Sequence, residues 1–192
     1  MSNSDYKNAE VRPRALLSDY IWVKENSLTR YFCNKVIKKF DNESKKYDGL
    51  IGSDGRVDRN VKVTKDFVLT RDPNWQKEDA VFCQALKKGL HEYSTYLKNI
   101  HPLNVPYTYE HVTDQGYKLQ RYEPNGFYDW HNDWIMHQLQ GSRIYVFMWY
   151  LNTIRKRDGG YTEFTDGTRL QPKCGSLVMF PATWTYLHRG YP

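Results

Sequence analysis

The chain has 192 residues, 40% of them hydrophobic and 16% aromatic, which suits one folded domain with its own core rather than a disordered chain. Its net charge of +6 comes from scattered short basic runs and does not favour nucleic acid as a partner. Three cysteines without a Cys-x-x-Cys pair argue against a zinc knuckle or a disulfide framework and favour a reducing compartment.

The first part of the chain predicts an arm, a helix and a loop. Residues 1–26 carry apolar patches typical of an edge strand or arm. Ser27 is the predicted N-cap of a helix that reaches about Phe40, because apolar residues then recur at helical spacing. The segment 41–60 is rich in Asp, Asn, Lys and Gly and predicts a mobile loop. We expect a strand over 61–69 to follow.

A second helix is predicted to begin at Asp72-Pro73-Asn74. Apolar residues recur at three- and four-residue steps from Ala80 to Leu97. His101-Pro102 should end this helix, because proline lacks an N–H and clashes with the preceding turn. We expect both helices to pack on the outside of a sheet.

From Tyr107 onward the pattern changes to short strands separated by turns rich in Gly, Pro and Asn. Such a pattern is typical of a β-sandwich or jelly roll. The predicted strands are 117–122, 127–133, 143–151, 161–165, 176–180 and 185–189.

Two histidines and one aspartate form a candidate metal site. Residues i and i+2 of a strand point to one face, so His131 and Asp133 should project together, and His188 can join them from a distant strand. Two imidazoles and a carboxylate are the ligand set of non-haem Fe(II) oxygenases, with the opposite face of the metal open. A His-x-Asp tripeptide by itself is weak evidence, because such surface pairs are usually solvated.

Further motifs surround these residues in a characteristic order along the sequence. They are Leu119–Pro124, Tyr128–Asp133, Tyr150-Leu151-Asn152, Gly159–Phe164, Gly175–Pro181 and His188-Arg189-Gly190. With these motifs, residues 117–190 resemble the Fe(II)/2-oxoglutarate-dependent oxygenases, within them the prolyl 4-hydroxylase-like branch.

The resemblance implies a mostly β fold with flanking helices, whose core is a double-stranded β-helix (jelly-roll, cupin-like) supported by the N-terminal helices. We expect a single oxygenase domain over residues 1–192. In it, 1–105 would supply the arm, helices and loop that pack on the barrel, and 106–192 the core, incomplete at its C-terminus.

The resemblance also assigns roles to individual residues. His131, Asp133 and His188 would bind Fe(II). Tyr122 matches a tyrosine that lines the cosubstrate pocket, and Tyr150 one whose hydroxyl bonds the far carboxylate of 2-oxoglutarate. Without the resemblance, both tyrosines can equally be core aromatics with satisfied hydroxyls.

Four more residues are candidates with weaker support. Thr162 matches a threonine that adds a hydrogen bond to the same carboxylate, although it can also be an ordinary strand threonine. Arg143 falls where the branch has an arginine near the bound peptide, or it is a surface ion-pair partner. Asp129 and Trp184 are further candidates for substrate binding, although Trp184 can also serve only to bury area.

One feature of the family has no counterpart in the sequence. The family has a Lys or Arg nine or ten residues after the distal histidine, which binds the distal carboxylate of 2-oxoglutarate, whereas Pro192 lies four residues after His188. We expect either that the protein continues past Pro192 or that another basic residue substitutes. Continuation is favoured, because the barrel otherwise keeps an open sheet edge.

The resemblance implies an Fe(II)- and 2-oxoglutarate-dependent dioxygenase that hydroxylates a C–H bond, with a prolyl residue of a protein or peptide as the leading substrate. Its cofactors would be Fe(II), 2-oxoglutarate and O2, with ascorbate as an optional reductant. The alternatives are an oxygenase acting on nucleic acid or a small molecule, and a binding module with impaired catalysis. The loop Gly49–Val63 is predicted as a substrate lid or an ordinary surface loop.

No membrane partner is expected from the sequence. It has no apolar run of the ~20 residues that span a bilayer and no signal-peptide pattern at its N-terminus. We therefore expect a cytoplasmic protein.

Overall fold

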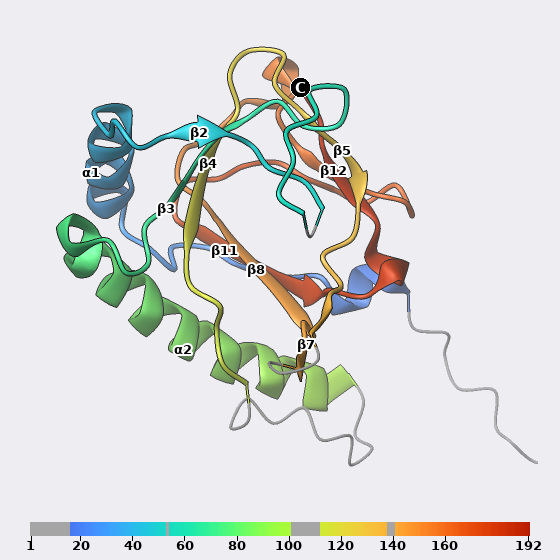
Figure 1. Cartoon of the computed structure of the whole chain (residues 1–192). Coiled ribbons are helices and arrows are strands. Elements are labelled where there is room, and N and C mark those ends of the chain that lie inside the picture. The colour runs from blue at the N-terminus through green and yellow to red at the C-terminus, as the bar shows by residue number, and fades with distance from the viewer. Residues whose placement is uncertain (1–15, 53, 101–111, 138–140) are drawn as a thin grey trace, which may run out of the picture.

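The computed structural model describes residues 16–52, 54–100, 112–137 and 141–192 (Figure 1). Two antiparallel sheets form its centre. The strands of the major sheet, in spatial order, are β1 (Trp22–Lys24), β11 (Ser176–Pro181) and β8 (Tyr145–Tyr150). Those of the minor sheet are β10 (Arg169–Leu170), β9 (Thr162–Phe164), β12 (His188–Gly190) and β5 (Tyr128–His131).

From β5 onward, the chain crosses repeatedly between the major and the minor sheet. This alternation is the topology of a jelly roll, so the predicted double-stranded β-helix is confirmed. Side chains of both sheets meet in one core, where the rings of Phe164 and Phe180 lie 5.0 Å apart and nearly perpendicular. Val146, Met148 and Tyr150 of β8 pack against the same core, as alternation along a strand requires.

Two smaller sheets complete the β structure. One contains, in spatial order, β2 (Tyr47–Asp48), β3 (Lys65–Val68) and β4 (Lys118–Arg121). The other pairs β6 (Met136–His137) with β7 (Gly141–Ser142). Within the described ranges, β8 pairs only with β11 and β4 only with β3, so each has one edge without a partner strand.

The two predicted helices cover the outer face of the major sheet, as expected (Figure 1). They are α1 (Arg30–Asp41) and α2 (Gln76–Ile100). The described residues also contain short 3-10 helices, which are η1 (Leu17–Tyr20), η2 (Pro73–Trp75), η4 (Lys156–Asp158) and η5 (Trp184–Tyr186). Leu177 and Met179 of β11 are fully buried against them. No described helix is both long and apolar enough to cross a membrane.

Several predicted boundaries were wrong. Thr29, not Ser27, caps α1, because its hydroxyl accepts a hydrogen bond from the Phe32 N–H at 3.2 Å. The Ser27 hydroxyl instead accepts a hydrogen bond from the Trp149 indole N–H at 3.1 Å.

The loop and two of the strands also differ from the prediction. The segment 41–60 contains β2, and the strand expected over 61–69 is regular only from Lys65. The strand expected over 185–189 begins at His188, because η5 occupies the preceding residues. The predicted helix end at His101-Pro102 lies outside the described residues, although α2 extends to Ile100.

Replacing Gly175 by alanine should lower the free energy of unfolding by about 3 kcal/mol. Its φ of +81° disfavours any side chain, and an added Cβ would lie 2.2 Å from the Leu28 carbonyl oxygen. Gly167→Ala is a matched control, since its φ is +87° but nothing lies within 4 Å of an added Cβ; it should cost only about 1 kcal/mol. Urea unfolding measures the free energy of unfolding of both variants. An equal decrease in the two would show that the close approach to Leu28 does not destabilise the Gly175→Ala variant.

Candidate metal centre

The two predicted histidine ligands lie opposite each other on neighbouring strands. His131 on β5 pairs with His188 on β12, and their ring centroids are 4.2 Å apart. The structure ends β5 at His131, so Asp133 lies past the strand rather than within it as predicted. Nevertheless, one ligand atom from each of the three residues lies within 4.8 Å of the others.

His188 and Asp133 approach each other within this group. The Nε2 atom of His188 lies 3.4 Å from Oδ2 of Asp133. His188 is only 6% exposed, whereas 31% of the Asp133 side chain is accessible to solvent. The group is therefore closed on the β12 side and open on the Asp133 side, as a site that admits reactants must be.

Backbone carbonyls fix the orientation of both imidazoles. Nδ1 of His131 lies 2.7 Å from the Asp129 carbonyl oxygen, and Nδ1 of His188 lies 3.0 Å from the Tyr186 carbonyl oxygen. A carbonyl only accepts, so each Nδ1 must carry the proton and each Nε2 keeps its lone pair. Histidines that bind metals through Nε2 are usually held in this way.

The protonation state of His131 also suits metal binding. Burial and, next, the nearby His188 lower its pKa to about 4, and Asp133 opposes this shift. A metal ligand has to be the neutral imidazole. His131 is therefore ready to bind a cation near neutral pH without first losing a proton, and the three residues fit an Fe(II) ion in donor type and orientation.

A β-bulge brings Tyr128 onto the same face as His131. Between the pairs His188–His131 and Gly190–Tyr128, β12 advances by two residues whereas β5 advances by three. The extra residue makes the rings of Tyr128 and His131 stack, with centroids 3.5 Å apart and planes 13° apart. Strict alternation would put residues three apart on opposite faces, so no signal in the sequence reveals this contact.

The predicted cosubstrate residues lie around the same interior. The Tyr150 hydroxyl donates a hydrogen bond to Oγ1 of Thr162 at 2.8 Å, and burial raises the pKa of Tyr150 to about 12. Desolvation and then the Asp66 carboxylate raise the pKa of Tyr122, with smaller contributions from Tyr150 and Asp133. Thr162 pairs with Gly190 of β12, the strand of His188, and a Cβ added at Gly190 would lie 3.0 Å from the ring of Tyr122, which is 42% exposed.

The three predicted substrate residues differ in their surroundings. Trp184 is 63% exposed, and its ring meets that of Trp134, next to Asp133, at 5.6 Å and 87°. Arg143 donates a hydrogen bond to the Gln115 side chain at 2.6 Å and lies close enough to Tyr128 to influence its pKa. The Asp129 side chain is exposed and bonds the Trp130 N–H, so Asp129 touches the site through its carbonyl.

The basic side chains around the minor sheet already have partners. Glu163, only 6% exposed, accepts hydrogen bonds from Arg169 and Arg189, each at 2.7 Å. These arginines lie on the strand face opposite to Thr162 and Phe164, which point into the core. The basic residue that the resemblance places after Pro192 stays a prediction, as does its substitution by another side chain.

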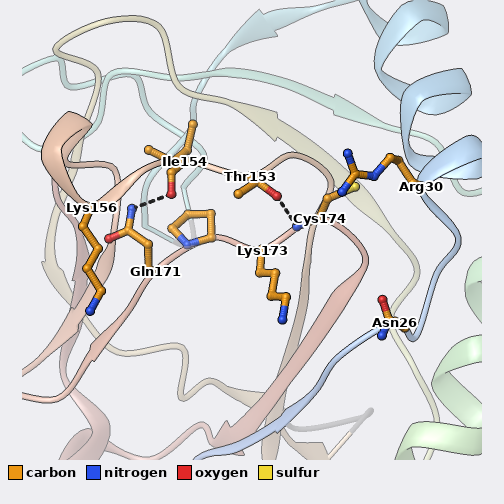
Figure 2. A pocket seen from close by; sticks show the side chains of 9 residues that line it. Asn26, Arg30, Thr153, Ile154, Lys156, Gln171, Lys173 and Cys174 are labelled. Atoms are coloured by element: carbon orange, nitrogen blue, oxygen red, sulfur yellow. Dashed lines mark hydrogen bonds between the residues drawn. The ribbon is translucent and has the colours of Figure 1, made fainter.

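A surface cavity of about 430 Å³ lies elsewhere, between the loop after β8 and the turn before β11 (Figure 2). Hydrogen bonds from the Cys174 N–H to Thr153 (3.0 Å) and from the Gln171 amide to the Ile154 carbonyl (3.1 Å) brace its walls. Its lining contains none of the candidate metal or cosubstrate residues. The cavity is therefore distinct from the metal centre.

A double-stranded β-helix that brings two histidines of adjacent strands together with an aspartate has the ligand set of mononuclear non-haem Fe(II) oxygenases. The resemblance found in the sequence is confirmed, because residues 117–192 match the family model described as "2OG-Fe(II) oxygenase superfamily". No curated protein sequence matches the chain.

Solved structures of prolyl hydroxylases share the fold over most of the chain. The viral collagen prolyl hydroxylase of Paramecium bursaria Chlorella virus-1, in complex with 2-oxoglutarate, has 17% identity and a TM-score of 0.59, and the match covers 90% of this chain and 88% of that one. A Pseudomonas putida prolyl 4-hydroxylase has 17% identity and a TM-score of 0.62, and the match covers 90% of this chain and 86% of that one. A Trichoplax adhaerens prolyl hydroxylase, solved with a hypoxia inducible factor peptide, has 14% identity and a TM-score of 0.61, and the match covers 91% of this chain and 78% of that one.

Proposed function

We propose that this protein is an Fe(II)- and 2-oxoglutarate-dependent dioxygenase that hydroxylates a prolyl residue of a protein or peptide. The observation that carries the proposal is the convergence of His131, Asp133 and His188, with both Nδ1 atoms held by backbone carbonyls. The superfamily match over residues 117–192 supports the same activity.

In this proposal each residue has a defined task. His131, Asp133 and His188 would hold Fe(II) on one face. When bound, the iron with 2-oxoglutarate and O2 supplies the oxidant, and 2-oxoglutarate is converted to succinate and CO2. The raised pKa of Tyr150 keeps its hydroxyl protonated. Because Tyr150 already donates to Thr162, the Thr162 proton remains available for a carboxylate oxygen.

An exposed apolar patch beside Asp133 supports a peptide substrate with an apolar ring. It consists of Trp134 and Trp184, whose rings meet edge to face at 5.6 Å, and Trp184 is 63% exposed. Indole faces bind apolar rings such as that of proline well. The Trichoplax adhaerens relative was solved with a peptide, which agrees with this choice of substrate.

The proposal is tested with the purified protein loaded anaerobically with Fe(II) and 2-oxoglutarate. After O2 is admitted, we expect succinate to form and proline-containing peptides to gain one oxygen atom by mass spectrometry. Oxygen gained by oligonucleotides or small molecules instead would replace the proposed substrate class. Protein that binds Fe(II) and forms no succinate would be a binding module.

Tyr150→Phe should raise the KM for 2-oxoglutarate about tenfold with little change in kcat. The variant loses the hydroxyl that donates to Thr162 and so leaves the Thr162 proton free for the cosubstrate carboxylate, and a hydrogen bond to a charged group contributes about 1.5–3 kcal/mol. Tyr161→Phe is the matched control, because the ring of Tyr161 stacks on that of Tyr191, with centroids 4.7 Å apart, and not on Thr162. Steady-state succinate formation gives both constants, and an unchanged KM would remove Tyr150 from the cosubstrate site.

A further inference from the structure

A buried ion pair lies behind the metal centre. Lys62 and Asp66 are 2% and 0% exposed, and the Lys62 ammonium lies 2.8 Å from Oδ2 of Asp66. Thr64 donates to the other carboxylate oxygen at 2.7 Å and Gln120 donates to Oδ2 at 3.1 Å. Asp66 is thus fixed from several sides and holds the lysine in one place.

Backbone hydrogen bonds attach the Lys62 segment to the strand that carries His131. The Val63 N–H donates to the Phe127 carbonyl and the Asp129 N–H donates to the Val61 carbonyl, each at 2.8 Å. Lys62 lies between these bonds and forms an isolated bridge with Tyr128. The end of the loop predicted as a possible lid is therefore part of the wall of the site.

The Lys62 side chain fits closely into this wall. A Cβ added at Gly49 would lie 2.7 Å from Cε of Lys62 and 2.1 Å from the Thr64 hydroxyl. A side chain at position 49 would therefore displace the lysine and its neighbour. Glycine at this position leaves the room that the buried lysine requires.

The ring of Tyr128 connects this lysine to the metal ligand. The Lys62 ammonium lies 4.8 Å from the centroid of the Tyr128 ring, within the range of a cation–π interaction. The same ring stacks on His131 at 3.5 Å. Lys62, Tyr128 and His131 thus form a continuous row that leads to His188, whose ring is 4.2 Å from that of His131.

We propose that Lys62, held by Asp66, is a positioning residue that fixes the His131 imidazole through the ring of Tyr128. The inference rests on the proposed metal site. A buried ion pair contributes little to stability compared with an apolar pair of similar size. The position of this ion pair behind His131 is therefore better explained by a role in orienting that imidazole. Groups that orient a metal ligand typically change metal affinity 10–100-fold when removed.

The test is an anaerobic Fe(II) titration of the whole protein and of Lys62→Met, with calorimetry as the readout. We expect the Kd for Fe(II) to rise about tenfold or more in the variant. Lys65→Met is the matched control. Lys65 is an exposed neighbour on β3 that pairs with Asp48, and its variant should keep the Kd of the unmodified protein.

A second variant keeps the proposal falsifiable if Lys62→Met does not fold. Tyr128→Leu leaves the ion pair intact and should weaken Fe(II) binding to a similar extent. The double variant with both substitutions should bind Fe(II) no more weakly than the weaker-binding single variant, because both changes interrupt the same row. A Co(II)-loaded sample of each variant should also show a shifted visible spectrum.

The outcomes separate this inference from the proposed function. If the unmodified protein binds no Fe(II), the metal site itself is wrong. If it binds Fe(II), but Lys62→Met and Tyr128→Leu melt at lower temperature with an unchanged Kd and an unchanged Co(II) spectrum, the row is structural only. That result would overturn the positioning role and leave the oxygenase proposal intact.

Discussion

His188→Ala is expected to abolish succinate formation and to weaken Fe(II) binding by about 100-fold or more. Loss of a group that only orients a metal ligand already lowers metal affinity about 10–100-fold. His188 is the most buried of the three candidate ligands, with 6% exposure. Its Nε2 lies 3.4 Å from Oδ2 of Asp133. Its removal would leave one imidazole and one carboxylate, which cannot cover one face of a six-coordinate ion.

Anaerobic Fe(II) titration and a succinate assay check this expectation. His91→Ala is the control, because His91 is an exposed histidine on α2, and we expect it to retain both activities. Thermal unfolding of the metal-free proteins shows whether the variant is folded. A folded His188→Ala protein with normal iron affinity would exclude His188 as a ligand and end the oxygenase interpretation.

The sequence singled out the three candidate ligands that the structure brings together, because each falls in a motif that local chemistry constrains. His131 and Asp133 are two residues apart, and His188 lies in a segment that follows an apolar strand. The order of short strands and turns was likewise enough to predict a β-sandwich or jelly roll, since that pattern depends only on alternation and turn residues. These features are local, so they can be recognised in one sequence without coordinates.

Contacts between distant segments were not predictable. Lys62 has no periodicity or motif that links it to Tyr128, and their proximity depends on how 61–63 pairs alongside β5. The bulge in β5 was missed for the same reason, because it exists only relative to β12. Very short strands such as β10, with two residues, contain too few positions to show a period.

The substrate proposal depends on side chains that the sequence could suggest only one by one. Trp184 was a candidate by its position near the distal histidine, whereas Trp134 gained its role only through the ring contact at 5.6 Å. Ile135 and Ile144 are also exposed, at 39% and 47%, which no motif in the sequence predicts. Surface patches of this kind are a property of the folded chain, not of a motif.

Phe180→Ala is expected to lower the free energy of unfolding by about 3–5 kcal/mol, as is typical when a buried phenylalanine is truncated. Phe180 is fully buried. Its ring packs nearly perpendicular to Phe164 at 5.0 Å and to His188 at 5.0 Å. The truncation therefore leaves a cavity directly behind a metal ligand as well as a gap between the two sheets.

Urea unfolding measures the loss, with Val68→Ala as control, because Val68 on β3 is 48% exposed and its truncation should change stability by about 0.5 kcal/mol or less. Phe180→Leu should restore part of the stability, because it refills most of the volume. If the cavity also frees the His188 ring, Fe(II) affinity measured well below the melting temperature should fall for Phe180→Ala and recover in Phe180→Leu. A stability loss with unchanged affinity would show that Phe180 is not needed to hold His188, whose Nδ1 lies 3.0 Å from the Tyr186 carbonyl oxygen.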